Sequence, residues 1–170
     1  NTGVAVVGHA CDIRALIELD KKIQANWDNI FTFSFEDAGY LGGKDKRMFF
    51  KKQKIEDDKI VYERLTPNSL LLKMDDGKIQ KYELGDLIDI NKNCQCCVRK
   101  SHPDADALIS TYALPEDSED YVFTPQSDRA KEIVEELGWE SKKTGDSFNE
   151  QYESVAEQIK ETCQANKDKD

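Results

Sequence analysis

The chain of 170 residues has little of what marks several large classes of protein. It has no excess of basic residues, since 24 Lys and Arg stand against 34 Asp and Glu, for a net charge of −10. Because a negative surface repels phosphate backbones, we expect no nucleic-acid partner. The longest apolar runs, such as VAVV at 4–7, are far shorter than the roughly 20 residues that span a bilayer. There is also no signal peptide with a basic start and an apolar stretch, so we expect a cytoplasmic protein without a membrane span.

An initiator methionine is absent as well, and the chain opens almost directly on an apolar run. We therefore expect a fragment, or one part of a larger unit. The length and the 38% of apolar residues allow one domain with a modest core and a polar segment attached. We expect residues 1–140 to form the domain, and residues 141–170 to form a final helix and a charged tail.

Hydrophobic periodicity predicts a βαβ unit at the start of the chain. Residues 4–7 are typical of a strand, residues 13–23 have helical spacing with Asp12 as the N-cap, and residues 29–35 alternate like a half-buried strand. A strand that returns after a helix pairs in parallel with the first strand.

The following stretch predicts antiparallel strands. Residues 60–65, 69–74 and 78–84 are separated by turn signals, of which Asp76-Gly77 is a strong hairpin signal. The remaining expected elements are a loop with some helix at 36–59, strands at 105–112 and 121–123, and helices at 124–138 and 146–166. Together these elements predict the α/β class, with a mixed sheet, an antiparallel hairpin and C-terminal helices.

Three of the five cysteines stand together as Cys94-Gln95-Cys96-Cys97. A small secreted protein would have spread, even-numbered cysteines, so this cluster indicates metal or redox chemistry inside the cell. The Cys94-x-x-Cys97 spacing turns two thiolates to one side of a loop, and zinc, an iron–sulfur cluster and a redox dithiol all use it. No second pair of this kind is present to favour a zinc ribbon.

Four further residues are candidates for a site. Cys11 lies at the start of the first expected helix, at the strand end where α/β sheets bind ligands. Either the helix amides favour its thiolate, which would suit a ligand, or Cys11 is simply a small buried apolar residue. His9 is a ligand, a proton donor near a flavin, or polar surface. Asp106 caps a turn, bonds a loop or touches a cofactor, because a buried carboxylate needs partners. We expect Cys163, near the charged tail, to be incidental.

The order of these motifs resembles the C-terminal domain of the beta subunits of coenzyme F420 hydrogenases and dehydrogenases. That family carries a strand, Gly-x-Pro-Cys and a helix, which matches Gly8-His9-Ala10-Cys11 except for the proline. The family pattern continues with an Asp-Gly turn, a C-x-x-C motif and an Ala-Asp-Ile strand. In this chain, the corresponding residues are 76–77, 94–97 and 105–107. The resemblance covers roughly residues 3–140.

This resemblance implies an iron–sulfur flavoprotein oxidoreductase subunit that relays electrons between F420 or a related acceptor, FAD and a [4Fe-4S] cluster. It implies that Cys11, Cys94 and Cys97 are cluster ligands and that Gly8 and His9 lie at the flavin cofactor. The implied partners are other oxidoreductase subunits of the hydrogenase, formate dehydrogenase or heterodisulfide reductase type.

The chain departs from the family pattern in three places. The smaller N-terminal domain and a cysteine after the second strand are absent, and Ser110 replaces a glycine. FAD would then need that domain or a partner, and the fourth cluster ligand is Cys96, Asp106 or a partner's residue. The alternatives are a non-catalytic accessory or interaction domain of the same fold, with a zinc site or no metal, and a thiol–disulfide redox module.

Overall fold

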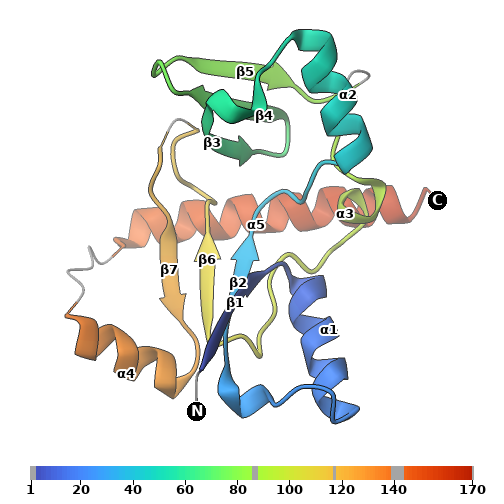
Figure 1. The fold of residues 1–170 in the computed structure, drawn as a ribbon. Helices are drawn as coiled ribbons and strands as arrows, with labels where there is room; N and C mark the ends of the chain where they lie inside the picture. The colour runs from blue at the N-terminus through green and yellow to red at the C-terminus, as the bar shows by residue number, and fades with distance from the viewer. Residues whose placement is uncertain (1–2, 86–87, 117, 139–143, 170) are drawn as a thin grey trace. The chain divides into compact units, whose positions relative to one another are not determined.

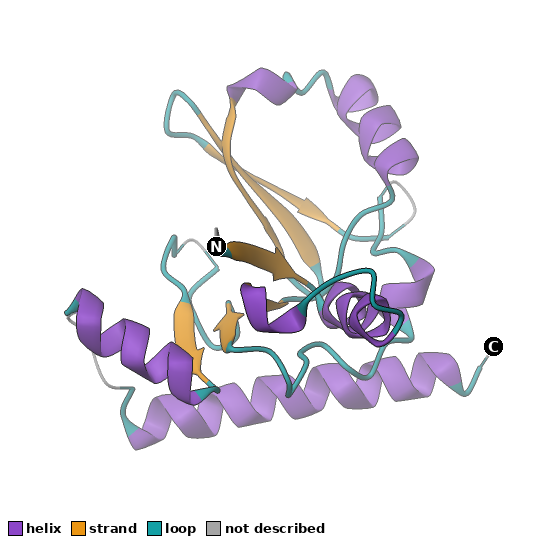
Figure 2. Cartoon of the chain, turned by 60° about the horizontal axis from the view of Figure 1, so that its bottom comes forward, coloured by secondary structure: helices purple, strands orange, loops and turns teal. Residues whose placement is uncertain are grey.

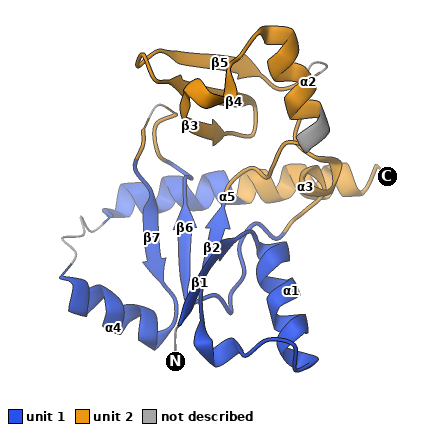
Figure 3. Ribbon diagram, viewed as in Figure 1, with its two compact units in different colours: residues 1–36, 99–113, 120–156 blue, residues 37–98, 114–119, 157–170 orange. Residues whose placement is uncertain are grey.

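The structure, a computed structural model, describes residues 3–85, 88–116, 118–138 and 144–169. The chain forms two compact units, each made of three stretches (Figure 3). Unit 1 comprises Asn1–Glu36, Arg99–Ala113 and Asp120–Ala156, and unit 2 comprises Asp37–Val98, Leu114–Glu119 and Glu157–Asp170. The domain boundary expected at residue 140 lies outside the described residues and stays a prediction. No helix in the described ranges has both the length and the apolar character needed to span a bilayer.

Unit 1 is built on a four-stranded mixed sheet (Figure 1). Its elements are β1 (Val4–Gly8), α1 (Ala10–Lys21), the 3-10 helix η1 (Trp27–Asn29), β2 (Ile30–Glu36), β6 (Ala107–Ser110), β7 (Val122–Pro125) and α4 (Asp128–Leu137). The strand order is β1-β2-β6-β7, in which β1, β2 and β6 are parallel and β7 is antiparallel to β6. The predicted βαβ unit and mixed sheet are confirmed.

Unit 2 is built on a three-stranded antiparallel sheet. Its elements are α2 (Gly43–Gln53), the 3-10 helix η2 (Asp57–Lys59), β3 (Ile60–Leu65), β4 (Ser69–Met74), β5 (Ile79–Glu83) and α3 (Lys92–Gln95). Gly77 in the β4–β5 turn has a φ of 81°, which glycine adopts without strain, and the predicted hairpin is confirmed.

A last helix, α5 (Asp146–Lys167), continues without interruption for 22 residues (Figure 2). Its residues up to Ala156 belong to unit 1, and those from Glu157 onward belong to unit 2. The helix expected at 146–166 is therefore confirmed to within one residue.

The hydrophobic core of unit 2 is built mainly from β4 and α2, with further residues from β3 and neighbouring loops. Leu70 and Leu72 are fully buried, and Phe49 and Phe50 from α2 belong to the same cluster. The Phe49 ring meets the Tyr82 ring edge-on, with centroids 5.1 Å apart. Each fully buried leucine contributes roughly 1.5–3 kcal/mol through loss of contact with water, so these side chains explain why a small sheet and one helix hold together.

Arg64 on β3 anchors the segment Leu114–Glu119 within unit 2. Its buried guanidinium donates to the carbonyl oxygens of Leu114 at 3.2 Å and Pro115 at 2.5 Å. Lys81 adds an ion pair to Glu116 at 2.6 Å. Hydrogen bonds from a charged donor are stronger than neutral ones, so Arg64 fixes the backbone at Leu114 and Pro115.

Two helices begin at residues other than the expected ones. The N-cap of α1 is His9 rather than Asp12, because the Asp12 carboxylate accepts the His9 backbone N–H at 2.9 Å from inside the first turn. The helix α4 begins at Asp128 rather than near residue 124, because Pro125 still pairs with β6. Ser127 is its N-cap, with a side chain that accepts the Ala130 amide.

The polar side chains of β2 are the buried ones. Thr32 and Ser34 have no exposed surface and Glu36 is 6% exposed, whereas the phenylalanines between them are half-buried. Buried polar groups need partners. Ser34 accepts the His102 amide at 3.0 Å, and Glu36 accepts a short hydrogen bond from the Tyr152 hydroxyl. Burial and this bond to Glu36 raise the pKa of Tyr152 well above its usual value, so the phenol stays protonated.

Candidate functional site

The Cys94-x-x-Cys97 pair lies in a tight turn at the end of α3. The Cys94 amide donates to the Asn91 carbonyl at 2.8 Å, and the Cys97 amide donates to the Cys94 carbonyl at 3.3 Å. A hydrogen bond of the latter kind closes a turn whose end Cα atoms lie within about 7 Å of each other. The side chains of Cys94, Cys96 and Cys97 are half-buried, and none of the five cysteines forms a disulfide. The backbone therefore keeps Cys94 and Cys97 close together in the chain's fold.

The backbone of Gly39 packs directly against Cys94. A Cβ atom at Gly39 would lie 2.6 Å from the Cys94 Cβ and 3.2 Å from its sulfur, and the φ of Gly39 is +133°. Only glycine fits such a contact and such a φ without strain. The Gly39 amide donates to the Asp37 side chain at 2.8 Å, and the Asn91 amide donates to the Tyr40 carbonyl at 2.9 Å. The first bond shapes the loop before α2, and the second joins that loop to the segment that carries the cysteine turn.

A second group of candidate residues lies in unit 1, where β1 leads into α1. Gly8 ends β1, His9 is the N-cap of α1, and Cys11 is exposed in the first turn of that helix. The His9 ring meets the Phe35 ring edge-on, with centroids 6.1 Å apart. This is the carboxyl edge of parallel strands, where open α/β sheets bind ligands. The local geometry agrees with the position that the sequence predicts for Cys11.

Gly8 is required by its close approach to Asp12. A Cβ atom at Gly8 would lie 2.8 Å from the Asp12 Cβ. We expect Gly8→Ala to lower the free energy of unfolding by about 2 kcal/mol, because it overpacks the turn and disturbs the helix cap. Urea unfolding followed by circular dichroism measures this effect. Gly3→Ala is the control, because the nearest atom to an added Cβ there is 4.0 Å away. Equal stability of the two variants would contradict this account of Gly8.

The predicted ligands are divided between the two units. Cys11 belongs to unit 1, and Cys94 and Cys97 belong to unit 2. Within the ranges that the structure describes, no three His, Cys, Asp or Glu side chains are arranged to hold a metal ion. The assignment of these three cysteines as cluster ligands stays a prediction, as does the placement of Gly8 and His9 at a cofactor.

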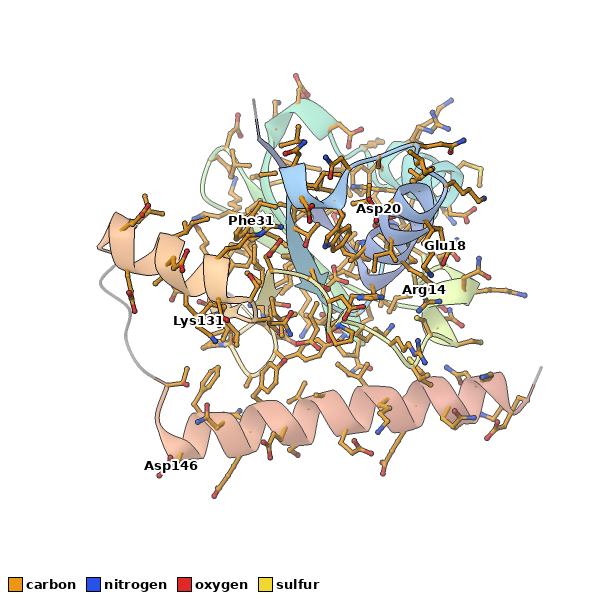
Figure 4. The ribbon with its side chains drawn as sticks, turned by 90° about the horizontal axis from the view of Figure 1, so that it is seen from below. Arg14, Glu18, Asp20, Phe31, Lys131 and Asp146 are labelled. Atoms are coloured by element: carbon orange, nitrogen blue, oxygen red, sulfur yellow. The ribbon has the colours of Figure 1, made fainter. Side chains whose placement is uncertain are left out.

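Asp106, a candidate ligand, has both carboxylate oxygens engaged inside unit 1. One oxygen accepts the Ser127 hydroxyl at 2.8 Å and Arg129 Nε at 2.7 Å. The other accepts the Thr32 amide at 2.8 Å, the Thr32 hydroxyl at 3.1 Å and an Arg129 terminal nitrogen at 2.5 Å. Arg129 also lies over the Phe31 ring, 5.3 Å from its centroid (Figure 4 labels Phe31). The carboxylate therefore bonds β2 to the start of α4.

The hydrogen bonds to Asp106 decide its charge. Burial acts to raise the pKa of this carboxyl, but the bonds from Arg129, Thr32 and Ser127 outweigh burial and hold the pKa at about 2. Asp106 is consequently a carboxylate at neutral pH, and its partners give it a structural role. The structure shows this carboxylate bonded to Thr32 of β2 and to Ser127 and Arg129 at the start of α4.

Sequence reasoning misses three residues beside the cysteine turn, namely Gly39, Cys163 and Asn166. Cys163, expected to be incidental, is buried to 4% exposure, with its sulfur 3.7 Å from the Cys94 carbonyl oxygen. Asn166 Nδ2 donates to the Gln95 carbonyl at 3.3 Å. The available signal is the spacing of residues 159, 163 and 166, which share one face of a helix.

Comparisons with known proteins agree with the fold and the motifs. The family model that describes the C terminus of the coenzyme F420 hydrogenase/dehydrogenase beta subunit matches residues 1–144. The F420-dependent formate dehydrogenase 1 subunit beta of Methanococcus maripaludis is 28% identical over 126 residues, which cover 71% of this chain and 33% of that protein. A chain of the F420-reducing [NiFe] hydrogenase complex from Methanosarcina barkeri has a TM-score of 0.72 at 13% identity, covering 96% of this chain and 60% of that chain.

The present chain thus spans a third of the formate dehydrogenase subunit and 60% of the hydrogenase chain. The hydrogenase chain shows that the fold is shared, and the predicted fold class is confirmed. The resemblance inferred from the motifs is also confirmed, because the family model matches most of the chain. This chain belongs to the family of the C-terminal region of coenzyme F420 hydrogenase/dehydrogenase beta subunits.

Proposed function

We propose that this chain is part of an oxidoreductase subunit that relays electrons between coenzyme F420 or a related acceptor, FAD and a [4Fe-4S] cluster. Family membership supports the oxidoreductase class, since the formate dehydrogenase and the hydrogenase named above are both F420 enzymes. The observation that carries the proposal is the turn that brings Cys94 and Cys97 together against the backbone of Gly39.

The donor set suits an iron–sulfur cluster, because such clusters are held by cysteine thiolates. We propose that Cys94 and Cys97 supply two from one turn and that Cys11, in the first turn of α1, supplies a third. A cluster held there would supply one-electron transfer. Cys96 or a partner's residue remains as the fourth ligand. We do not retain Asp106 as a candidate, because both of its oxygens bond Arg129.

For FAD, we propose the carboxyl edge of β1, where Gly8 and His9 lie. The N–H of His9 bonds Asp12, and its ring lies edge-on to Phe35, so its position in the turn is defined. The rest of the flavin site would come from the other domain of the longer relatives or from a partner. We propose other oxidoreductase subunits as partners, with an exterior of net charge −10 available for electrostatic docking.

Anaerobic purification with analysis of iron, sulfide, zinc and flavin on one sample tests this function. We expect about four irons and a matching amount of sulfide per chain, with a broad brown absorbance shoulder. We expect flavin bands when a partner, or an N-terminal domain of the kind that the family carries, is supplied to complete the flavin site. Zinc alone, or a colourless metal-free chain after anaerobic iron–sulfide reconstitution, would overturn the proposal and identify a non-catalytic accessory domain.

A further inference from the structure

We propose that Cys163 and Asn166 on α5 are positioning residues that hold the Cys94-x-x-Cys97 turn. The inference rests on the proposed function only in taking this turn as a cluster-binding segment. The contacts themselves lie entirely within unit 2. Neither residue is offered as a ligand.

Two side chains of α5 reach consecutive carbonyls of α3. The Cys163 thiol points at the Cys94 carbonyl oxygen, with 3.7 Å between sulfur and oxygen. Asn166 Nδ2 donates to the Gln95 carbonyl oxygen at 3.3 Å. Residues three apart on a helix lie on the same face, so one face of α5 makes both contacts.

The burial pattern of α5 shows that this face is the one turned inward in unit 2. Among residues 157–169, only Ile159, Cys163 and Asn166 are not exposed. Cys163 is 4% exposed, although the helix ends four residues later in a charged tail. Two of the three inward residues are therefore polar groups directed at the cysteine turn.

The turn needs such donors because α3 is only four residues long. The last carbonyls of a helix have no intrahelical partner, and buried carbonyls left without one are costly. Cys94 also accepts the Cys97 amide at 3.3 Å, so the thiol of Cys163 adds a second donor at the same oxygen. Gly39 contacts Cys94 as well, so the loop before α2 and the helix α5 both restrain this residue.

These positioning residues lie beyond residues 1–144, which the family model matches. They are thus a feature of this chain that the family assignment does not supply. Groups that orient a metal ligand tune the metal that it binds, and hydrogen bonds and solvent exposure set the potential of an iron–sulfur cluster. We expect α5 to influence the cluster through the orientation of Cys94.

The first test uses the metal-free protein and measures the rate at which iodoacetamide alkylates Cys94 and Cys97, read by mass spectrometry. Asn166→Ala should raise the Cys94 rate about fivefold, the effect of losing one typical hydrogen bond on a local opening equilibrium. Cys163→Ala should also raise it, because it removes a weaker donor and the packing of a buried side chain. Cys163→Ser, which keeps a donor, should return the rate towards that of the unmodified protein. Glu161→Ala, at an exposed position of the same helix, is the matched control and should change nothing.

The second test uses the cluster-loaded protein and records its reduction potential and electron paramagnetic resonance spectrum. Cys163→Ala should shift the reduction potential and change the spectrum, and Cys163→Ser should restore the potential and spectrum of the unmodified protein. If the unmodified chain holds no cluster, the proposed function fails while the alkylation test still decides the positioning role. Alkylation rates that match the unmodified protein in Cys163→Ala and Asn166→Ala would overturn the inference, even in a chain that binds its cluster. Asn166 is only half-buried, so Asn166→Ala should fold. The alkylation test therefore stays decisive even if Cys163→Ala fails to fold.

Discussion

Replacing either Cys94 or Cys97 by alanine is expected to abolish cluster binding. The turn brings these two residues together, and each variant would leave one thiol where the C-x-x-C motif supplies two. A cluster of this kind is held by four ligands, so loss of one from the paired motif removes much of its attachment. Iron and sulfide analysis after anaerobic reconstitution measures the result, and we expect less than about a tenth of the iron of the unmodified chain.

Cys96→Ala is the informative comparison, because this thiol is half-buried in the same turn. Retention of iron would leave the fourth ligand to a partner's residue, and loss would assign it to Cys96. Circular dichroism of each variant shows whether the fold is kept. A full iron complement in Cys94→Ala or Cys97→Ala would show that the motif does not hold the cluster.

The largest expected effect on stability comes from Asp106→Asn. The change removes the charge that Arg129 pairs with in unit 1 and weakens the bonds to Thr32 and Ser127. Removing one partner of a buried ion pair costs about 3–5 kcal/mol, and the partial exposure of Arg129 places our expectation at about 3 kcal/mol. Urea unfolding followed by tryptophan fluorescence and circular dichroism measures the loss. Asp104→Asn is the control, since the Asp104 side chain is 70% exposed.

The same pair predicts a pH dependence. Folding lowers the pKa of Asp106 from 3.8 to about 2, so its stabilisation is complete above pH 4 and is lost as the pH falls towards 2. The difference in unfolding free energy between the unmodified chain and Asp106→Asn should therefore shrink over this range. A difference that stays constant from pH 6 to pH 2.5 would mean that the carboxylate is not the group responsible.

Local signals were sufficient for much of the fold. The hairpin at Asp76-Gly77 and the strand at residues 30–36 follow from turn residues and from alternation within a few positions. Alternation could not say which face of β2 is buried, because the partners of Thr32 and Glu36 come from Asp106 and Tyr152, more than seventy residues away. In an alternating strand, the aromatic residues would ordinarily be assigned to the buried face. In β2 the buried face instead carries polar side chains that form a hydrogen-bond network.

The candidate site shows the same limit. The closeness of Cys94 and Cys97 follows from their spacing, because a single turn determines it. The spacing of residues 159, 163 and 166 puts Cys163 on one face of the last helix, but it does not say that this face packs against the cysteine turn of unit 2. The need for glycine at position 39 likewise arises from its contact with Cys94, which lies far away in the sequence.

Neither unit is encoded by one uninterrupted piece of sequence. The anchored segment Leu114–Glu119 illustrates this, since the chain leaves β6 of unit 1, completes unit 2 at Arg64 and then returns to form β7. Stretches far apart in the chain must meet before either unit is whole, and long-range closure of this kind slows folding. A chain shortened before residue 114 would lack parts of both units at once. Neither unit can therefore be produced alone as one continuous segment of this chain, although each has its own sheet.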